Sequence, residues 1–107
     1  MKTITLKLSV GEWPAVLHVQ RYSNNRIAIE CLDPNDGEPI AVATVNLPDE
    51  HLGENEVFIK DYSENEGMLN SLMEAGIVSA PIDMVQSGFV QIPKCKLLWN
   101  ILDELNP

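Results

Sequence analysis

Alternating apolar and polar residues run through the first half of the chain and constrain its fold more than any other feature. From Thr3 to Val10, every second residue is apolar. Successive side chains of a strand point to opposite faces, so this period of two predicts a half-buried strand. The same reasoning predicts four further strands, over Trp13–Tyr22, Arg26–Leu32, Ile40–Leu47 and Glu56–Lys60. Short polar turns separate the first four strands, which predicts an antiparallel meander.

A polar joint, residues 61–66, leads into a predicted central helix. Apolar residues recur after it at helical spacing: Met68, Leu69, Leu72 and Met73. Ser63 and Glu66 match a capping box, in which the side chain of each residue accepts the backbone N–H of the other. Gly76 stands where a left-handed residue ends a helix, and Ile77 can pack back on the last turn. Ser63, Glu66 and Gly76 are therefore predicted structural caps.

The rest of the second half is less regular. Pro81 and Gly88 interrupt the segment 77–88, which we expect to be irregular, and Phe89–Ile92 is a predicted last strand. Leucines spaced at four and three residues predict a short C-terminal helix over Leu97–Leu105. We therefore expect a single α+β domain over residues 1–107. It would be an antiparallel meander of about five to six strands with one central capped helix and a short C-terminal helix.

Carboxylates gather around the joint and suggest a surface for a partner. Capping requires neither Lys60, Asp61 nor Tyr62, and Asp61 belongs to a local acidic cluster. A catalytic acid/base pair there would need one carboxyl pKa raised by burial, which so polar a stretch does not favour. The candidate partner-binding residues are Glu54, Glu56, Lys60, Asp61, Tyr62 and Glu64.

The whole chain is acidic, with 7 Lys and Arg against 16 Asp and Glu and a net charge of −9. Phosphate recognition relies on clusters of basic residues. Direct nucleic-acid binding and binding to an anionic membrane are therefore not expected. The charge favours solubility, or a partner with a basic face. The N-terminus lacks the pattern of a signal peptide, and no apolar run approaches the roughly 18 residues of a membrane span, so we expect a cytoplasmic protein.

The two cysteines and two histidines predict neither a metal nor a cofactor. Cys31 and Cys95 are 64 positions apart, and with His18 and His51 they show no ligand spacing. We expect reduced, buried thiols. The alternative is a reactive Cys95, whose neighbours Lys94 and Lys96 would lower its pKa if it were exposed.

No catalytic pattern stands out, and we predict that the protein is not an enzyme. The chain has neither a glycine-rich phosphate loop nor a nucleophile elbow. An enzyme would need a pocket that unites Asp61 and Tyr62 with His18 or His51.

Four segments carry a resemblance to a known family: Asp36–Pro39, Asn46–Pro48, Phe58–Leu69 and Gln86–Gly88. Over residues 35–98 the chain resembles a family of small proteins of unknown function that are encoded on phages and conjugative elements of gut bacteria. The family has no assigned activity, so the resemblance implies no catalytic residue. It implies a bacterial cytoplasm and a mobile element, whose accessory proteins include inhibitors of host defence.

Three functions follow as hypotheses. The first is a non-enzymatic binding module or inhibitor that acts on a host protein with a basic face, because an acidic surface can imitate nucleic acid. The second is an oligomeric protein that sequesters a small ligand, with an anion held by the N–H groups of Ser63–Glu66. The third is a structural domain without an inhibitory role. A homo-oligomer is compatible with each of them.

Overall fold

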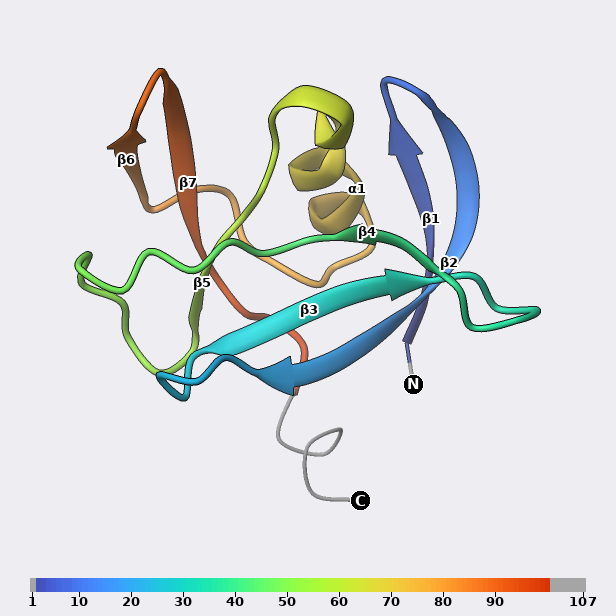
Figure 1. The fold of residues 1–107 in the computed structure, drawn as a ribbon, viewed down its shortest axis with the longest axis horizontal. Coiled ribbons are helices and arrows are strands. Elements are labelled where there is room, and N and C mark those ends of the chain that lie inside the picture. The colour runs from blue at the N-terminus through green and yellow to red at the C-terminus, as the bar shows by residue number, and fades with distance from the viewer. Residues whose placement is uncertain (1, 101–107) are drawn as a thin grey trace.

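Seven strands and one short α-helix make up the part of the protein that the computed structural model describes, residues 2–100 (Figure 1). A four-stranded antiparallel sheet has the order β1-β2-β3-β4, and a three-stranded sheet has the order β5-β7-β6. The strands are β1 (Lys2–Leu8), β2 (Gly11–Arg21), β3 (Ile27–Leu32), β4 (Pro39–Val42), β5 (Glu56–Phe58), β6 (Asp83–Ser87) and β7 (Val90–Lys96). A 3₁₀ turn η1 (Ser63–Asn65) and the helix α1 (Met68–Glu74) lie between β5 and β6.

The two sheets are joined where the chain leaves β4. Thr44 forms an isolated antiparallel bridge with Ile59. Val45 N donates to Phe58 O, and Lys60 N donates to Ala43 O. These contacts link the two sheets next to β4 and β5, whose opposite edges are β1 in the first sheet and β6 in the second.

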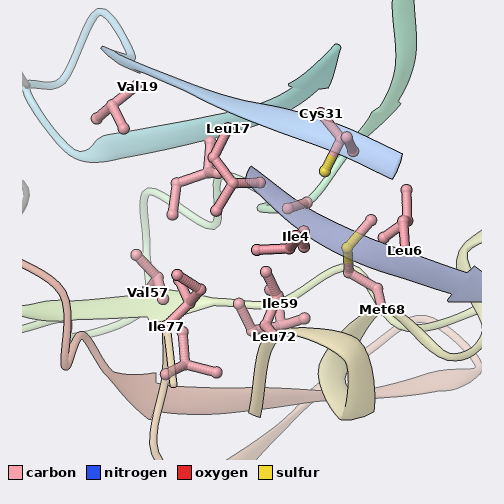
Figure 2. Close-up of a cluster of buried hydrophobic side chains, with 14 of the residues drawn as sticks. Ile4, Leu6, Leu17, Val19, Cys31, Val57, Ile59, Met68, Leu72 and Ile77 are labelled. Carbon is pink, nitrogen blue, oxygen red and sulfur yellow. The ribbon is translucent and has the colours of Figure 1, made fainter. Parts of the chain in front are cut away.

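One hydrophobic core lies between the two sheets and the helix. Figure 2 shows Ile4 and Leu17 of the first sheet pointing toward Val57 of β5 and toward Ile59, the residue after β5. Met68, Leu72 and Ile77, from α1 and its end, complete this core and are fully buried. The alternating pattern of the first half of the chain thus delivers one apolar face per strand to a shared interior.

The α+β class is confirmed, and so is the antiparallel meander for the first four strands, with shifted boundaries. The prediction of five to six strands in one meander is wrong, because residues 2–100 contain seven strands in two sheets. The predicted strand Ile40–Leu47 is shorter, because β4 ends at Val42 and only Thr44 continues the pairing. The segment 77–88 is not irregular throughout, since it contains β6. Gly88, expected to interrupt regular structure, has a φ of 59° and is the first residue of a two-residue turn between β6 and β7. Glycine at that position is typical of a hairpin turn.

The predicted C-terminal helix does not begin at Leu97. Leu97 instead forms an isolated antiparallel bridge with Val78, and its N–H donates to Asn55 O. The residues up to Asn100 are not helical. The remainder of the prediction, residues 101–105, lies outside the described residues. The leucine spacing is wrong as a helix signal at Leu97, because tertiary pairing overrides a short local pattern.

Within residues 2–100, no helix is long and apolar enough to cross a membrane.

Candidate functional site

The joint between β5 and α1 does not contain the predicted capping box. Tyr62 precedes η1 and Gly67 precedes α1, and neither end has a side-chain cap from Ser63 or Glu66. Ser63 has a left-handed φ of 54°, and Gly67 has a φ of 107°. Glu66 N donates to the backbone O of Ser63 rather than to its hydroxyl. The prediction was wrong because two left-handed residues divide the segment, so that Ser63 is the first residue of a 3₁₀ turn instead of the residue before α1.

Asp61, a predicted partner-binding residue, caps α1. Its Oδ1 accepts the N–H of Leu69 at 2.9 Å and that of Gly67 at 3.2 Å. A carboxylate at this place satisfies free donors of the first turn and interacts favourably with the helix dipole. The N–H groups at the start of α1 are therefore already occupied by a carboxylate of the chain itself. The ligand-sequestering hypothesis named other N–H groups, those of Ser63–Glu66, and two of these are also engaged, because Asn65 N donates to Tyr62 O and Glu66 N donates to Ser63 O.

Asn65 ties the joint to the first sheet. It is buried, and its Nδ2 donates to Val42 O at 2.7 Å and to Lys60 O at 3.1 Å. A buried amide without partners would cost free energy, so these bonds fix the path of the joint beside β4. The sequence analysis gave Asn65 no role, because its partners are distant in the chain.

The joint and α1 also cover the edge of β1. Ser9 N donates to Glu66 O, and Lys7 N donates to Ser71 Oγ, each at 2.9 Å. A Cβ on Gly67 would lie 2.2 Å from Lys7 O, so only glycine allows this close approach. Residues 61–71 therefore act together as a seal on the C-terminal end of β1, at Lys7, and on Ser9 just after it.

The predicted C-terminal cap of the helix is confirmed. Gly76 has a φ of 73°. Its N–H donates to Met73 O, and Ile77 N donates to Leu72 O, which is the paired bonding of a Schellman motif. Ile77 is fully buried, as the expected packing on the last turn requires.

The six candidate partner-binding residues do not form one cluster. Glu54 and Glu56 lie before and at the start of β5, whereas Glu64 lies beyond its end. The extended stretch from Glu56 to Lys60 separates the two groups by about 13 Å. Glu54 is exposed, and the Glu56 carboxylate accepts Gly53 N at 2.7 Å.

At the other end, Lys60 organises a small surface group. Its Nζ lies 3.5 Å from the carboxylate of Glu64 and 5.7 Å from the ring centre of half-buried Tyr62. The pKa of exposed Glu64 is lowered by its own backbone N–H and then by Lys60. This pair lies on the surface, where ion pairs contribute little to stability.

A concavity of about 500 Å³ lies between the β2–β3 turn and the loop before β5. Its lining includes Arg21 and Arg26 from the turn side and Glu54 and Glu56 from the loop side. The guanidinium of Arg26 is engaged, because it donates to Leu47 O at 2.6 Å and to Glu50 O at 2.5 Å. The lining includes none of the residues that an enzyme was expected to unite, namely Asp61, Tyr62, His18 and His51.

Other carboxylates lie on exposed turns without a nearby cation. The β3–β4 turn carries Asp33, Asp36 and Glu38, and the first two also accept N–H groups of the turn. Nitrogens of described basic residues come within 4 Å of three carboxylates: Glu74, Glu64 and, beside His18, Glu30. Most of the acidic surface of residues 2–100 therefore faces solvent without an internal counter-charge.

Both thiols are free and buried, as expected. Burial, and then the charge of Glu30, raises the pKa of Cys31 to about 12. Burial, and then the charge of Asp61, raises the pKa of Cys95 to about 11. The neighbouring lysines do not activate Cys95, because its side chain points into the core. Among residues 2–100, no three His, Cys, Asp or Glu side chains gather as a metal site would require.

The β6–β7 hairpin differs from the rest of the surface, and the sequence analysis did not single it out. Phe89 at its tip is fully exposed, and Ile82 and Met84 are about half exposed. Between Ala75 and Leu102 the chain carries one carboxylate, Asp83, and two lysines, Lys94 and Lys96. This gap in an otherwise acidic sequence is the signal that could have found the hairpin.

No protein-family model, no curated protein and no solved structure matches the chain.

Proposed function

We propose that the protein is a non-enzymatic binding module that acts on a protein with a basic face. The observation that carries this proposal is the unpaired acidic surface. Outside residues 75–102, the chain holds 15 carboxylates and 5 basic residues, a net charge of −10. Such a field attracts a basic partner and raises its association rate. The role that fits such a module is inhibition of host defence, by a protein that is encoded on a mobile element and acts in the bacterial cytoplasm.

The structure narrows the surface that this module would use. Asp61 is engaged in capping α1, and Glu56 in holding Gly53, so these two carboxylates are less free to bind. Glu54, Glu64 and Glu66 are exposed. The structure gives the carboxylates of Glu54 and Glu66 no hydrogen bond or ion pair within residues 2–100, and the carboxylate of Glu64 is held at the surface by its own backbone N–H and by Lys60. We therefore assign the partner contact to these three carboxylates.

A charge-reversal experiment tests the assignment. Tagged wild-type protein and a variant with Glu54→Lys, Glu64→Lys and Glu66→Lys are used to capture proteins from a bacterial lysate at about 50 mM salt. Bound proteins are identified by native mass spectrometry. We expect a basic protein to bind the wild type, to be released at about 500 mM salt, and to be lost with the triple variant, since screening weakens exposed charges.

The matched control carries Glu12→Lys, Glu38→Lys and Glu74→Lys, three carboxylates on other elements. It changes the net charge equally, so its binding should stay close to that of the wild type. Equal capture by the wild type and the Glu54/Glu64/Glu66 variant contradicts the assignment. Capture of no basic protein contradicts the proposed function and favours a structural domain without an inhibitory role.

A second candidate function is the sequestration of a small ligand, which the concavity beside Arg21 favours. Its volume of about 500 Å³ suits a small molecule, and its lining offers both guanidinium and carboxylate groups. When nucleotides and dicarboxylic acids are tested one by one at about 1 mM, a compound that binds there should raise the melting temperature of the wild type. Arg21→Gln should abolish the rise. A panel that shifts no melting temperature contradicts this candidate.

A further inference from the structure

The outer edge of β6 is the open edge of the sheet. β6 pairs with β7 alone, and nothing among residues 2–100 covers its other side. The opposite edge, at β1, is bonded to Glu66 and Ser71. An uncovered strand edge is a template for pairing with another chain.

The register shows which backbone groups the open edge presents. Met84 lies opposite Pro93, which has no N–H and whose O accepts Ile59 N on the far side. Met84 and Pro93 are thus a pair without mutual hydrogen bonds. In an antiparallel ladder such residues turn their polar groups away from each other. Met84 and, two residues on, Gln86 therefore direct their N–H and C=O groups outward.

One of these outward groups already has a partner. Asp83 Oδ1 accepts Met84 N at 2.9 Å. The side chain of Gln86 bonds to Gly88 O and to Gln91, and so leaves the backbone of Gln86 uncovered. Shielding of a single N–H by a local carboxylate is a weak protection, which a second strand can replace.

We propose that two copies of this chain pair antiparallel through their β6 edges about Val85. In this register Met84 of each copy lies opposite Gln86 of the other, and their outward N–H and C=O groups form two mutually bonded pairs. Asp83 lies opposite Ser87 of the second copy, so that no two like charges oppose each other. The tip residue Phe89 comes beside Pro81 and Ile82 of the second copy. The exposed apolar side chains of the hairpin are thereby covered.

Charge and topology favour a second copy as the occupant. Two chains of net charge −9 repel, and the edge lies in the stretch from Ala75 to Leu102, whose net charge is +1. Pairing there keeps the acidic loops of the two copies apart. The contact uses the same β6 edge of both copies about a two-fold axis, so the assembly closes at a dimer instead of growing into a filament.

The test measures mass and amide protection over concentration. Sedimentation equilibrium of the full chain from about 5 to 500 µM should show the mass rising from 11.9 kDa toward twice that value. The dissociation constant should be micromolar, because one strand pair and two aromatic contacts make a small interface. Hydrogen exchange of Met84 and Gln86 should slow as the concentration rises.

Gln86→Pro removes an outward N–H without removing a backbone hydrogen bond to β7, and should shift the dissociation constant at least tenfold. The double variant Met84→Lys, Phe89→Ser should do the same without altering the backbone. Val10→Lys, which changes another exposed apolar residue, on the β1–β2 turn, should leave the dimer intact. Circular dichroism confirms that each variant is folded.

Salt distinguishes this contact from binding by the acidic surface. Raising salt from about 50 to 500 mM should preserve or strengthen the dimer, because it screens repulsion between the two copies. A chain that stays monomeric at 500 µM overturns the proposal. So does a dimer that survives both hairpin variants, or one that dissociates in salt, since salt-sensitive association would mean that lysines of one copy meet the acidic loops of another. None of these results bears on the proposed partner of the acidic surface.

Discussion

The β1 edge and the β6 edge differ in how their unpaired backbone N–H and C=O groups are covered. At the end of β1, Lys7 N donates to Ser71 Oγ of α1 and Ser9 N donates to Glu66 O, and Gly67 lets the two backbones come close together. At β6, one N–H is shielded by Asp83, and apolar side chains stand exposed beside it. An edge that is covered contributes to the stability of the fold, whereas an edge left open remains available for association.

This contrast teaches that the joint before α1 serves the fold. The same segment supplies the cap of the helix, the bonds of Asn65 to the first sheet and the seal on β1. Little of it is left for a partner except Glu64 and Glu66. The surfaces free to act are therefore the acidic loops and the β6 edge, and changes at the two edges should have very different effects on stability.

Gly67→Ala should have the largest effect on the covered edge. The left-handed φ of 107° and a Cβ at 2.2 Å from Lys7 O require α1 and β1 to separate. We expect the free energy of unfolding to fall by about 3 kcal/mol or more, measured by urea unfolding. Gly37→Ala is the control, because it is also left-handed but meets no atom within 4 Å. It should cost about 1–2 kcal/mol, and equal losses for the two variants would contradict the close contact.

Asp61→Ala should come next, because it removes the cap of α1. Two N–H groups lose their acceptor, and the free energy of unfolding should fall by about 1–2 kcal/mol in urea unfolding. Glu66→Ala, at the position that the sequence pattern favoured as a cap, should change it by less than about 0.5 kcal/mol. A larger loss of free energy of unfolding for the Glu66 variant than for Asp61→Ala would instead support the predicted capping box.

Alkaline pH should lower the free energy of unfolding, because each of the two sheets holds a buried thiol. The pKa is raised by burial to about 12 for Cys31 in β3 and to about 11 for Cys95 in β7. A thiol of the unfolded chain has a pKa of about 8.5. Below that pH both states hold the proton and stability is unaffected. Above it the unfolded chain releases the proton first, so the free energy of unfolding falls by about 1.4 kcal/mol per pH unit per thiol until the folded pKa is reached.

Urea unfolding between pH 8 and about 10.5 measures this slope. The variant with both Cys31→Ala and Cys95→Ala is measured at each pH as the reference for the wild type, because other groups titrate in the same range. The slope should flatten in this variant. An unchanged slope would mean that neither thiol resists ionisation. A thiol reagent should label Cys95 before Cys31 as the pH rises, because its pKa is lower and it lies nearer the open edge.

Asp83→Ala should have the smallest effect on stability and should sharpen the contrast between the edges. It frees an N–H that already faces solvent, so the free energy of unfolding should change by less than about 0.5 kcal/mol. The variant should nevertheless associate more tightly in sedimentation equilibrium, because Met84 N–H no longer has an internal acceptor. A large loss of stability would instead show that Asp83 holds the hairpin together.

Much of the fold is predictable, because the first half of the chain uses local patterns that its tertiary structure respects. The period of two places Ile4, Leu6, Leu17 and Ile29 in the core, and Gly76 ends α1 where its position in the pattern predicts. The second half departs from prediction where pairing partners are distant. Gly88 becomes a hairpin turn only because β6 has β7 beside it.

The candidate site is less predictable, for the same physical reason. Asp61, Asn65 and Gly67 are three polar or small residues in a row of similar ones, and a sequence does not show which N–H or C=O each will meet. Their partners are Leu69 N, Val42 O and Lys7 O, and the last two lie far away in the chain. A capping box is a local rule, and here non-local contacts replaced it.

The sequence by itself determined the α+β class, the alternation that builds the first sheet and the excess of negative charge. These depend on composition and on contacts between near neighbours, which are readable along the chain. Only the tertiary structure decided that β1 is sealed and β6 is open, that Asp61 caps the helix, and that the acidic residues are dispersed. Each of these depends on which backbone groups meet across the fold, and that is settled when buried polar groups must all find partners at once.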